Sequence, residues 1–274
     1  MVMAKGNGLR RGRRHSPPAR SGRSDDLARR VLTAQDLAVP RARHREPWHR
    51  DVQGGTARAA VFGISDGLVS NVSLILGFAG AAPAPSVVRL AGIAGLLSGA
   101  CSMAAGEYVS MRAQRELFAR ELHVEAAQIT EDPDGEHAQL VDIFINRGIE
   151  PETARLLATE HMRTPELALL THAREELGID PTELGSPWGA AGSSFVAFAV
   201  GASVPLVPWL LLTGGAAVWL SVLLGAVAAL AIGGTLGRLA GRSPLRSALR
   251  QLTVAALAAG VTYLIGTLIG VTIA

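Results

Sequence analysis

The sequence contains one cysteine, Cys101, so no disulfide bond can form within the chain. It has no glycine-rich phosphate loop and no other enzyme motif, which predicts a protein that is neither an enzyme nor driven by ATP. The N-terminal segment 1–50 lacks the apolar stretch of a secretory signal peptide. Because this segment is rich in Arg, Ser and Pro and poor in aromatic residues, it cannot bury enough surface to fold alone, and we expect a disordered tail.

Long apolar runs, in contrast, are abundant. Hydrophobic residues make up 49% of the chain, and its mean hydropathy is +0.28. A helix that crosses a bilayer needs about 20 predominantly apolar residues, and five runs reach that length. The sequence therefore predicts an all-α integral membrane protein with five transmembrane helices. The runs are Ala57–Ala82, Val87–Arg112, Gly189–Thr213, Ala216–Leu236 and Leu252–Ala274.

Charge is distributed unevenly along the chain. Residues 1–50 carry 13 Lys and Arg against 4 Asp and Glu, whereas Glu107–Ser186 carries 17 acids against 7 arginines. The acidic stretch lies between spans two and three, and it predicts a helical insert on one side of the membrane. The chain then divides into a basic tail (1–50), spans one and two (51–112), an acidic helical metal-binding domain (113–186) and spans three to five (187–274).

The orientation follows from the positions of Lys and Arg, which accumulate on the cytoplasmic side of membrane proteins. The basic tail and the loop between spans four and five fall on one side of a five-span protein, and so does the acidic insert. We therefore expect a cytoplasmic N-terminus and an external C-terminus. Abundant Ala, Gly and Arg favour a bacterial plasma membrane. A basic tail on a membrane protein favours contact with anionic lipid over binding of nucleic acid. The loop arginines are Arg238, Arg242, Arg246 and Arg250.

Span one carries one acid in the middle of its apolar run, Asp66. A charge at that depth costs about 2.5–3.5 kcal/mol on insertion scales, so an acid there is by default a functional candidate. At 100° per residue, Gly63, Asp66 and Ser70 fall on one narrow stripe. Two structural alternatives remain: an acid hydrogen-bonded between helices, and a buried helix of a soluble protein.

Span two places glycines beside a methionine and a second acid. Gly95, Gly99, Met103 and Glu107 share one face of the helix. Glycines let helices approach closely in lipid, and Gly63 and Gly67 have the same spacing in span one. A carboxylate beside a thioether suits a borderline transition metal better than Mg²⁺ or Ca²⁺. The structural alternative for the methionine is gap-filling.

These faces also predict a homodimer. One Asp66 and one Met103 offer too few ligands to replace the water shell of a metal ion. A two-fold axis repeats every residue of an isologous interface and would double both ligands.

The sequence of the acidic insert predicts a continuation of span two followed by three shorter helices. No Gly or Pro interrupts Met111–Ile129, where Glu121 and Glu125 share a face at i, i+4. The shorter helices are expected near Glu136–Asn146, from Pro151, and from Pro165 after a Thr164 cap to a stop at Gly178. His172 and Glu176 share a face of the last helix at a spacing that chelates metals. A solvated acidic surface explains the same charges equally well.

The chain resembles the vacuolar iron transporter family over residues 50–274. The matching strings are GISDGLVSNVSLILG at 63–77, AGIAGLLSGACSMAAGEYVSMRAQRE at 91–116, HAREELGI at 172–179 and PLRSALRQ at 244–251. The resemblance implies a homodimer that moves Fe²⁺, and often Mn²⁺, out of the cytoplasm in exchange for protons. It places Asp66 and Met103 on the ion path, and Glu125, Glu136 and Glu176 in a cytoplasmic metal site. Ser70 and Glu107, which share the helix faces of Asp66 and Met103, are further candidates for the ion path. Glu121, one turn before Glu125, is a further candidate metal ligand.

The chain also departs from the family pattern. Gly95 stands where family members often carry a further glutamate, Gln128 and Gln139 replace two glutamates, and His172 replaces a methionine. Within the resemblance, transport through the membrane is better supported than high-affinity cytoplasmic loading.

Three functions follow, in order of preference. The first is a proton-coupled transporter of Fe²⁺ or Mn²⁺, with Zn²⁺ and Co²⁺ as further candidates and no tightly bound cofactor. The second is a membrane-anchored metal buffer or sensor, which has no use for an acid at mid-bilayer. The third is a nucleic-acid tether that uses the basic tail, which leaves Asp66 and Met103 unexplained.

Overall fold

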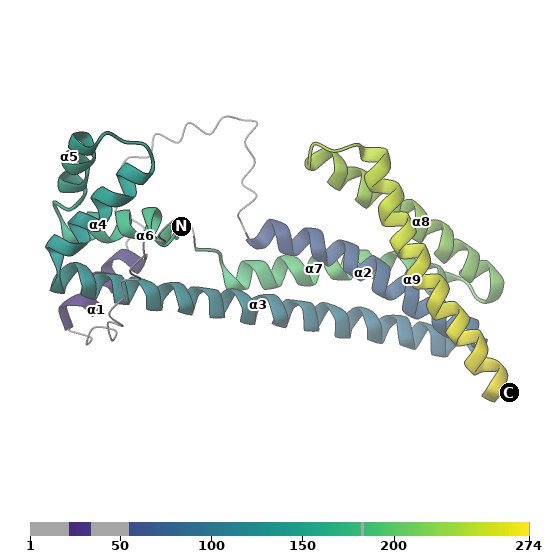
Figure 1. Ribbon diagram of the computed structural model, residues 1–274. Coiled ribbons are helices and arrows are strands. Elements are labelled where there is room, and N and C mark those ends of the chain that lie inside the picture. Colours follow the sequence, from purple (N-terminus) through teal and green to yellow (C-terminus); the bar gives the residue numbers. More distant parts are fainter. Residues whose placement is uncertain (1–21, 34–54, 182–183, 274) are drawn as a thin grey trace, which may run out of the picture. The chain divides into compact units, whose positions relative to one another are not determined.

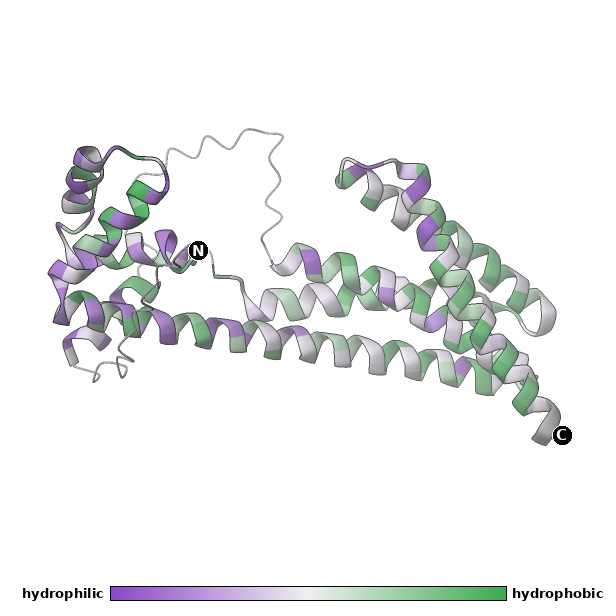
Figure 2. Cartoon of the chain, viewed as in Figure 1, coloured by the Kyte–Doolittle hydropathy of each residue, from purple (hydrophilic) through white to green (hydrophobic). Residues whose placement is uncertain are grey.

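The structure is a computed structural model that describes residues 22–33, 55–181 and 184–273, and its regular secondary structure there is entirely helical (Figure 1). Five of the helices are long and apolar enough to cross a membrane, which confirms the predicted fold class. Figure 2 shows hydrophobic residues concentrated on these helices, except in the second half of the longest one, which mixes both kinds as the other helices do. The five are α2 (Gly55–Gly80), α3 (Pro85–Glu131), α7 (Pro187–Leu211), α8 (Gly214–Leu239) and α9 (Pro244–Ile273). The remaining described helices are α1 (Gly22–Thr33), α4 (Pro133–Asn146), α5 (Pro151–His161) and α6 (Pro165–Glu175).

Proline and polar caps set the helix starts. Six of the described helices begin with proline, whose fixed φ suits the first helical position and whose missing N–H would find no partner there. The predicted start of α6 is confirmed, since the Thr164 hydroxyl accepts the Leu167 N–H at 3.2 Å. α4 begins at Pro133, three residues before the predicted start, because Asp132 caps it by accepting the Gly135 N–H at 3.0 Å. α3 continues through Met111–Ile129 as predicted.

The chain forms two compact units. One, here called the membrane unit, contains α2, the first part of α3 and α7–α9. The other, the helical unit, contains α1, the last part of α3 and α4–α6. The helical unit begins within α3 at residue 115 and ends at residue 184, before α7.

In the membrane unit α2 packs against α7, α8 and α9, and half of its most apolar window is buried (50%, against 17% for α3). Glycine makes the contact with α7 close. A Cβ atom on Gly63 would lie 2.8 Å from the Ser194 carbonyl oxygen, and one on Gly67 would overlap the Phe198 carbonyl. α7 also contributes a glycine to this contact, Gly201, where a Cβ would overlap the carbonyl oxygen of Ile64. Small residues thus bring the two backbones together.

The glycines of α3 also pack within the chain. A Cβ on Gly95 would overlap the Leu74 side chain of α2, and one on Gly99 would overlap the Phe198 ring of α7. The glycine faces of spans one and two are therefore occupied inside one protomer. They do not supply the free surface on which the sequence argument for a dimer rested.

For residues 22–33 the expectation of a disordered tail is wrong. Leu27, Ala28 and Val31 of α1 are buried in a cluster with Leu122 and Leu169 of the helical unit. The three residues form an apolar stripe at i, i+1 and i+4, which the strongly charged composition of the tail conceals. Arg30 also reaches Glu166 at 3.7 Å. The rest of the predicted tail lies outside the described residues.

We expect Gly67→Ala to destabilise the protein, because its new Cβ would press on the α7 backbone, which cannot move aside as a flexible side chain does. Overpacking of this kind costs about 1–3 kcal/mol. The measurement is the thermal unfolding midpoint of the purified protein in detergent. The matched control is Gly260→Ala on α9, where nothing lies within 4 Å of the added Cβ. Equal midpoints for the two variants would contradict the close α2–α7 packing.

Candidate metal centre

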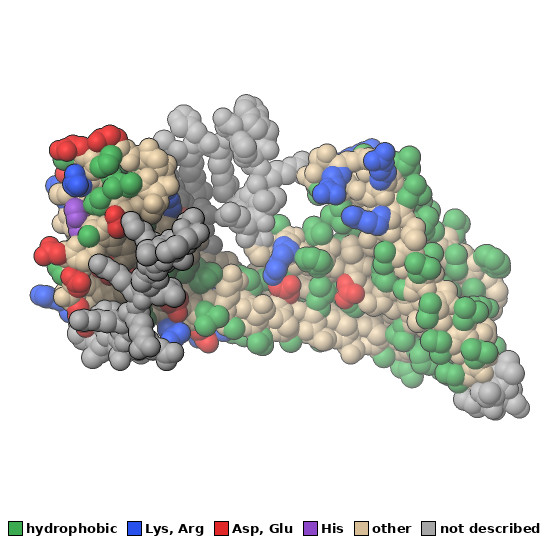
Figure 3. All heavy atoms as spheres, viewed as in Figure 1, with side chains coloured by type: hydrophobic (Ala, Val, Ile, Leu, Met, Phe, Trp, Pro, Cys, Tyr) green, Lys and Arg blue, Asp and Glu red, His purple; other side chains and the backbone are tan. Residues whose placement is uncertain are grey.

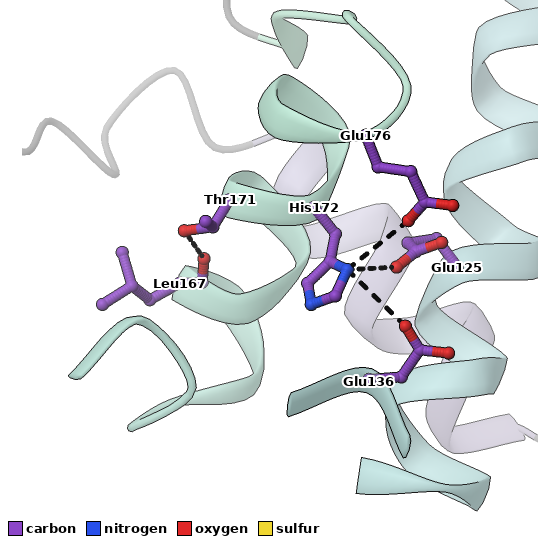
Figure 4. Close-up of polar contacts among 6 residues, drawn as sticks. All are labelled: Glu125, Glu136, Leu167, Thr171, His172 and Glu176. Carbon is purple, nitrogen blue, oxygen red and sulfur yellow. Dashed lines mark hydrogen bonds and ion pairs between the residues drawn. The ribbon is translucent and has the colours of Figure 1, made fainter. Parts of the chain in front are cut away.

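Four acidic and imidazole side chains converge inside the helical unit (Figure 4). Each of them offers one ligand atom, and these atoms all lie within 4.8 Å of one another. They come from three helices that the chain brings together: Glu125 from α3, Glu136 from α4, His172 from α6, and Glu176 at the residue that ends α6. The sequence prediction named all four, and the structure places them in one cluster.

The local structure explains this convergence. α3 runs past its membrane-spanning part without a break and so carries Glu125 into the helical unit. The Asp132 cap reverses the chain and places Glu136 in the first turn of α4. His172 and Glu176 are four residues apart and therefore lie one above the other on α6.

His172 lies at the centre of the cluster. Its Nδ1 atom is 3.0 Å from Glu125 Oε1, 3.5 Å from Glu136 Oε2 and 3.6 Å from Glu176 Oε2. The imidazole is fully buried, Glu125 and Glu136 are buried, and Glu176 is partly exposed. The opening at Glu176 leaves one side of the cluster accessible from solvent.

The cluster contains more negative charge than it can neutralise. Three carboxylates face one imidazole, and no Lys or Arg of the described chain forms an ion pair with them. Glu125 Oε1, Glu136 Oε2 and both His172 nitrogens are buried without a well-formed hydrogen bond to another described group. Uncompensated buried charge is strongly destabilising, so the cluster requires protons or a bound cation. These atoms fit a cation as ligands.

The pKa values reflect that excess of negative charge. Burial first, and then the charge of Glu125, raise the pKa of Glu136 from 4.5 to about 7. For His172, burial alone would lower the pKa, but the neighbouring Glu125 and Glu136 carboxylates outweigh it and raise the pKa above its usual value. Near neutral pH the cluster therefore holds protons that a metal ion would displace.

Neighbouring residues of the same types have other roles. His123, His137 and His161 each bond a backbone carbonyl or a threonine hydroxyl, at 2.6, 3.0 and 2.9 Å respectively. Glu175, next to Glu176, pairs with Arg147 instead. Glu121, which was predicted as a further ligand, lies one turn before Glu125, is 44% exposed and faces Arg120 at 3.4 Å. The cluster is therefore selective rather than a general acidic surface.

The predicted ion-path residues lie in the membrane unit. Ser70 donates a hydrogen bond to Asp66 Oδ1 at 3.1 Å, and both side chains are exposed on α2. Met103 packs with Ala100 and Phe198, as a gap-filling methionine does. Glu107 is mostly buried and lies 3.6 Å from Arg58. The structure thus pairs Asp66 with Ser70 and gives Met103 and Glu107 structural contacts of their own.

A buried amide on α2 joins this helix to α7, and the sequence patterns above do not identify it. Asn71 of α2 is 1% exposed and donates to the Ala202 carbonyl of α7 at 2.7 Å, while its own oxygen has no partner among the described residues. An amide within an apolar run was the available signal. Hydrogen bonds of this kind join helices in membranes.

The fold and the cluster together define a class. The chain is an integral membrane protein with five spans, and its helical unit holds a buried set of three carboxylates and one imidazole. Carboxylates suit hard cations, whereas an imidazole suits Zn²⁺, Fe²⁺ and related ions, so the set fits a divalent transition metal.

The chain belongs to the VIT family, which matches it over residues 57–267. It is similar to vacuolar iron transporter 1 of Oryza sativa subsp. japonica, with 30% identity over 229 residues that cover 83% of this chain and 91% of that protein. Vacuolar iron transporter 1 of Arabidopsis thaliana is 30% identical over 211 residues (77% and 84%). The vacuolar iron transporter of Acanthamoeba castellanii is 33% identical over 226 residues (80% and 81%).

We expect metal affinity at the cluster to fall with pH. As the pH drops through about 7, Glu136 takes up a proton that a metal must displace, so binding weakens roughly tenfold per pH unit for each proton released. The measurement is calorimetric titration of the full-length protein with Mn²⁺ between about pH 8 and about pH 6. Glu136→Gln removes this titration and should flatten the profile.

The stability of the metal-free protein changes with pH in the opposite direction to the metal affinity. A carboxyl whose pKa is raised on folding favours the folded state fully below its unfolded pKa, and that contribution is lost as the pH rises from 4.5 to about 7. Without metal, Glu136→Gln should therefore be more stable than the parent at pH 8. Affinity that is independent of pH, together with unchanged stability, would contradict the assignment.

Proposed function

We propose that this protein is a transporter that moves Fe²⁺, and also Mn²⁺, out of the cytoplasm in exchange for protons. The observation that carries the proposal is the buried cluster of Glu125, Glu136, His172 and Glu176 in a five-span member of the VIT family. The relatives are named as iron transporters, which makes iron the first candidate. Their names also agree with the absence of enzyme motifs from the sequence.

The cluster serves as the cytoplasmic loading site. The positive-inside rule places it on the cytoplasmic side, with the loop between α8 and α9. Three carboxylates attract a divalent cation, and the imidazole favours a transition metal over Mg²⁺ and Ca²⁺. The same donors accept Zn²⁺ and Co²⁺. Because the ligands must be deprotonated to bind a metal, loading of the site releases protons, and the site loses its metal readily at low pH.

Asp66 is the group in the membrane path that binds metal and proton alternately. A carboxylate binds either a proton or a cation, so the two compete for one site. Exposure of that site first to the cytoplasm and then to the other side would exchange metal outward for protons inward. Ser70, which donates to Asp66, holds the carboxylate in place.

The exposure of Asp66 supports a dimer. Its carboxylate and Ser70 lie on the outside of one protomer, within a span that lipid would otherwise surround. A carboxylate facing lipid is costly, so this face needs a protein cover. A second copy related by a two-fold axis would cover it and bring two Asp66 carboxylates to one path.

The alternative is a membrane-anchored metal buffer or sensor. One observation favours it: the cluster is complete within the helical unit and needs no residue of the membrane unit to bind a metal. The two functions differ at Asp66, which only a transporter requires.

We expect Asp66→Asn to insert and dimerise normally but to lose metal-dependent proton movement. The change keeps the size of the side chain and removes its charge. A loss of about 1.4 kcal/mol in the free energy of metal binding would already weaken the affinity tenfold. The measurement is Fe²⁺ or Mn²⁺ transport in proteoliposomes, with and without a pH gradient. Ser70→Ala keeps the acid and removes only its hydrogen bond, so it should reduce transport less than Asp66→Asn does. Transport by Asp66→Asn at the parent rate, with the same pH dependence, would refute the mechanism.

We also expect a cysteine at position 70 to cross-link to its twin. In a Cys101→Ser background, Ser70→Cys carries the chain's only thiol on the face that the dimer would bury. Disulfide formation in native membranes would be measured on a non-reducing gel. Leu223→Cys, on an exposed part of α8, is the matched control. Cross-linking of the control alone would place the interface elsewhere.

A further inference from the structure

The second half of the membrane unit contains positive charge without any negative charge. From residue 184 to the C-terminus the sequence has no Asp or Glu, yet the end of α8 and the start of α9 carry Arg238, Arg242, Arg246 and Arg250. Figure 3 shows basic side chains gathered at that end of the two helices. None of these arginines forms an ion pair with a residue that the structure describes.

Three of the arginines share one cavity. Arg242, Arg246 and Arg250, together with Ser243 and Ser247, line a hollow of about 340 Å³. Orientation of the membrane protein alone would require only that the arginines lie on one side. It would not require three guanidinium groups around one hollow, where they repel one another.

The hollow is built on rigid backbone. The turn before α9 uses Gly241 at φ +64°, and the Ser247 N–H donates to the Ser243 carbonyl at 3.1 Å. A Cβ on Gly233 would lie 2.6 Å from the Ser247 carbonyl oxygen, and one on Gly237 would lie 2.8 Å from the Ser247 hydroxyl. These glycines hold the start of α9 against α8, so the arginines project from a fixed platform.

The surroundings point to a lipid rather than a free anion. Guanidinium groups match the oxygens of a phosphate with paired hydrogen bonds. Beside the arginines, Leu245 and Leu249 project from α9 and are 68% and 49% exposed. The hollow lies at the end of two candidate membrane spans, which is where lipid headgroups gather. A soluble phosphate would have no use for the leucines, whereas a phospholipid would use both groups.

We propose that Arg242, Arg246 and Arg250 bind the phosphate of an anionic phospholipid, whose acyl chains lie along Leu245 and Leu249. The negative charge of the lipid phosphate reduces the repulsion among the three arginines, and the bound lipid secures the α8–α9 end of the membrane unit. This site is separate from the metal cluster and from Asp66, so its test does not depend on transport.

The test uses the full-length protein in a neutral detergent. The thermal unfolding midpoint is measured after addition of phosphatidylglycerol, phosphatidylcholine or excess inorganic phosphate. The protein should gain stability from phosphatidylglycerol alone, because binding to the folded state raises its stability. The triple variant Arg242→Gln, Arg246→Gln, Arg250→Gln should lose that gain, with about a tenfold weaker lipid affinity. The control, Arg115→Gln, Arg155→Gln, Arg163→Gln, removes the same charge and should keep the gain.

A second variant tests the same site in case the glutamine variant does not fold. The triple variant Arg242→Lys, Arg246→Lys, Arg250→Lys keeps the charge but loses the paired geometry, so phosphatidylglycerol should bind it less tightly. Lysine and parent proteins of equal affinity would mean general attraction of charge and would overturn the site. An equal gain from inorganic phosphate would overturn the lipid, and an equal gain in the glutamine variant would overturn the assignment to these arginines.

Discussion

The negative charge buried around His172 is the constraint on which the helical unit depends. Three carboxylates meet one imidazole within 3.6 Å, and the described chain supplies no arginine or lysine to balance them. Such a cluster would destabilise the protein unless protons or a cation enter it. The raised pKa of Glu136 shows that burial and like charge favour the proton in the absence of metal. Metal and proton are therefore alternatives in this unit, which is the property that a proton-coupled metal transporter needs.

The rest of the helical unit holds the donors in place. Leu27 and Val31 of α1 pack against Leu122 of α3 and Leu169 of α6, and these two residues lie three positions from Glu125 and His172. α1 thus braces both ligand-bearing helices through an apolar core. In the membrane unit, glycines play the corresponding role, since they let α2 and α7 pack tightly and leave the face of Asp66 and Ser70 outside.

Much of this could be predicted from the sequence, because the signals are local. Span lengths follow from runs of apolar residues, and Thr164 with Pro165 fixes a helix start from neighbouring residues alone. Glu125 and Glu136 were named through the family resemblance, and His172 with Glu176 through spacing. Helix α1 was missed because its three buried residues sit among arginines and aspartates, where composition outweighs a short stripe.

The remaining differences depend on tertiary contacts. Helical spacing gave Glu121 and Glu125 one face, but only the packing of α4 and α6 decides which turn of α3 meets them. The glycines of spans one and two were expected at a dimer interface, yet their partners are Phe198 and Leu74 of the same chain. A small residue in a span predicts a close contact between helices, but it does not identify which helix makes that contact.

Direct binding to the full-length protein tests whether the buried cluster is a metal site. Titration with Fe²⁺ or Mn²⁺ at pH 7.5 would compare the parent with Glu125→Gln, inside the cluster, and Glu121→Gln, one turn away. Both variants lose one carboxylate from the same helix. We expect saturable binding and thermal stabilisation in the parent and in Glu121→Gln, and at least about tenfold weaker binding in Glu125→Gln. Equal affinities in all three proteins, or no binding in the parent, would mean that the cluster is not the metal site.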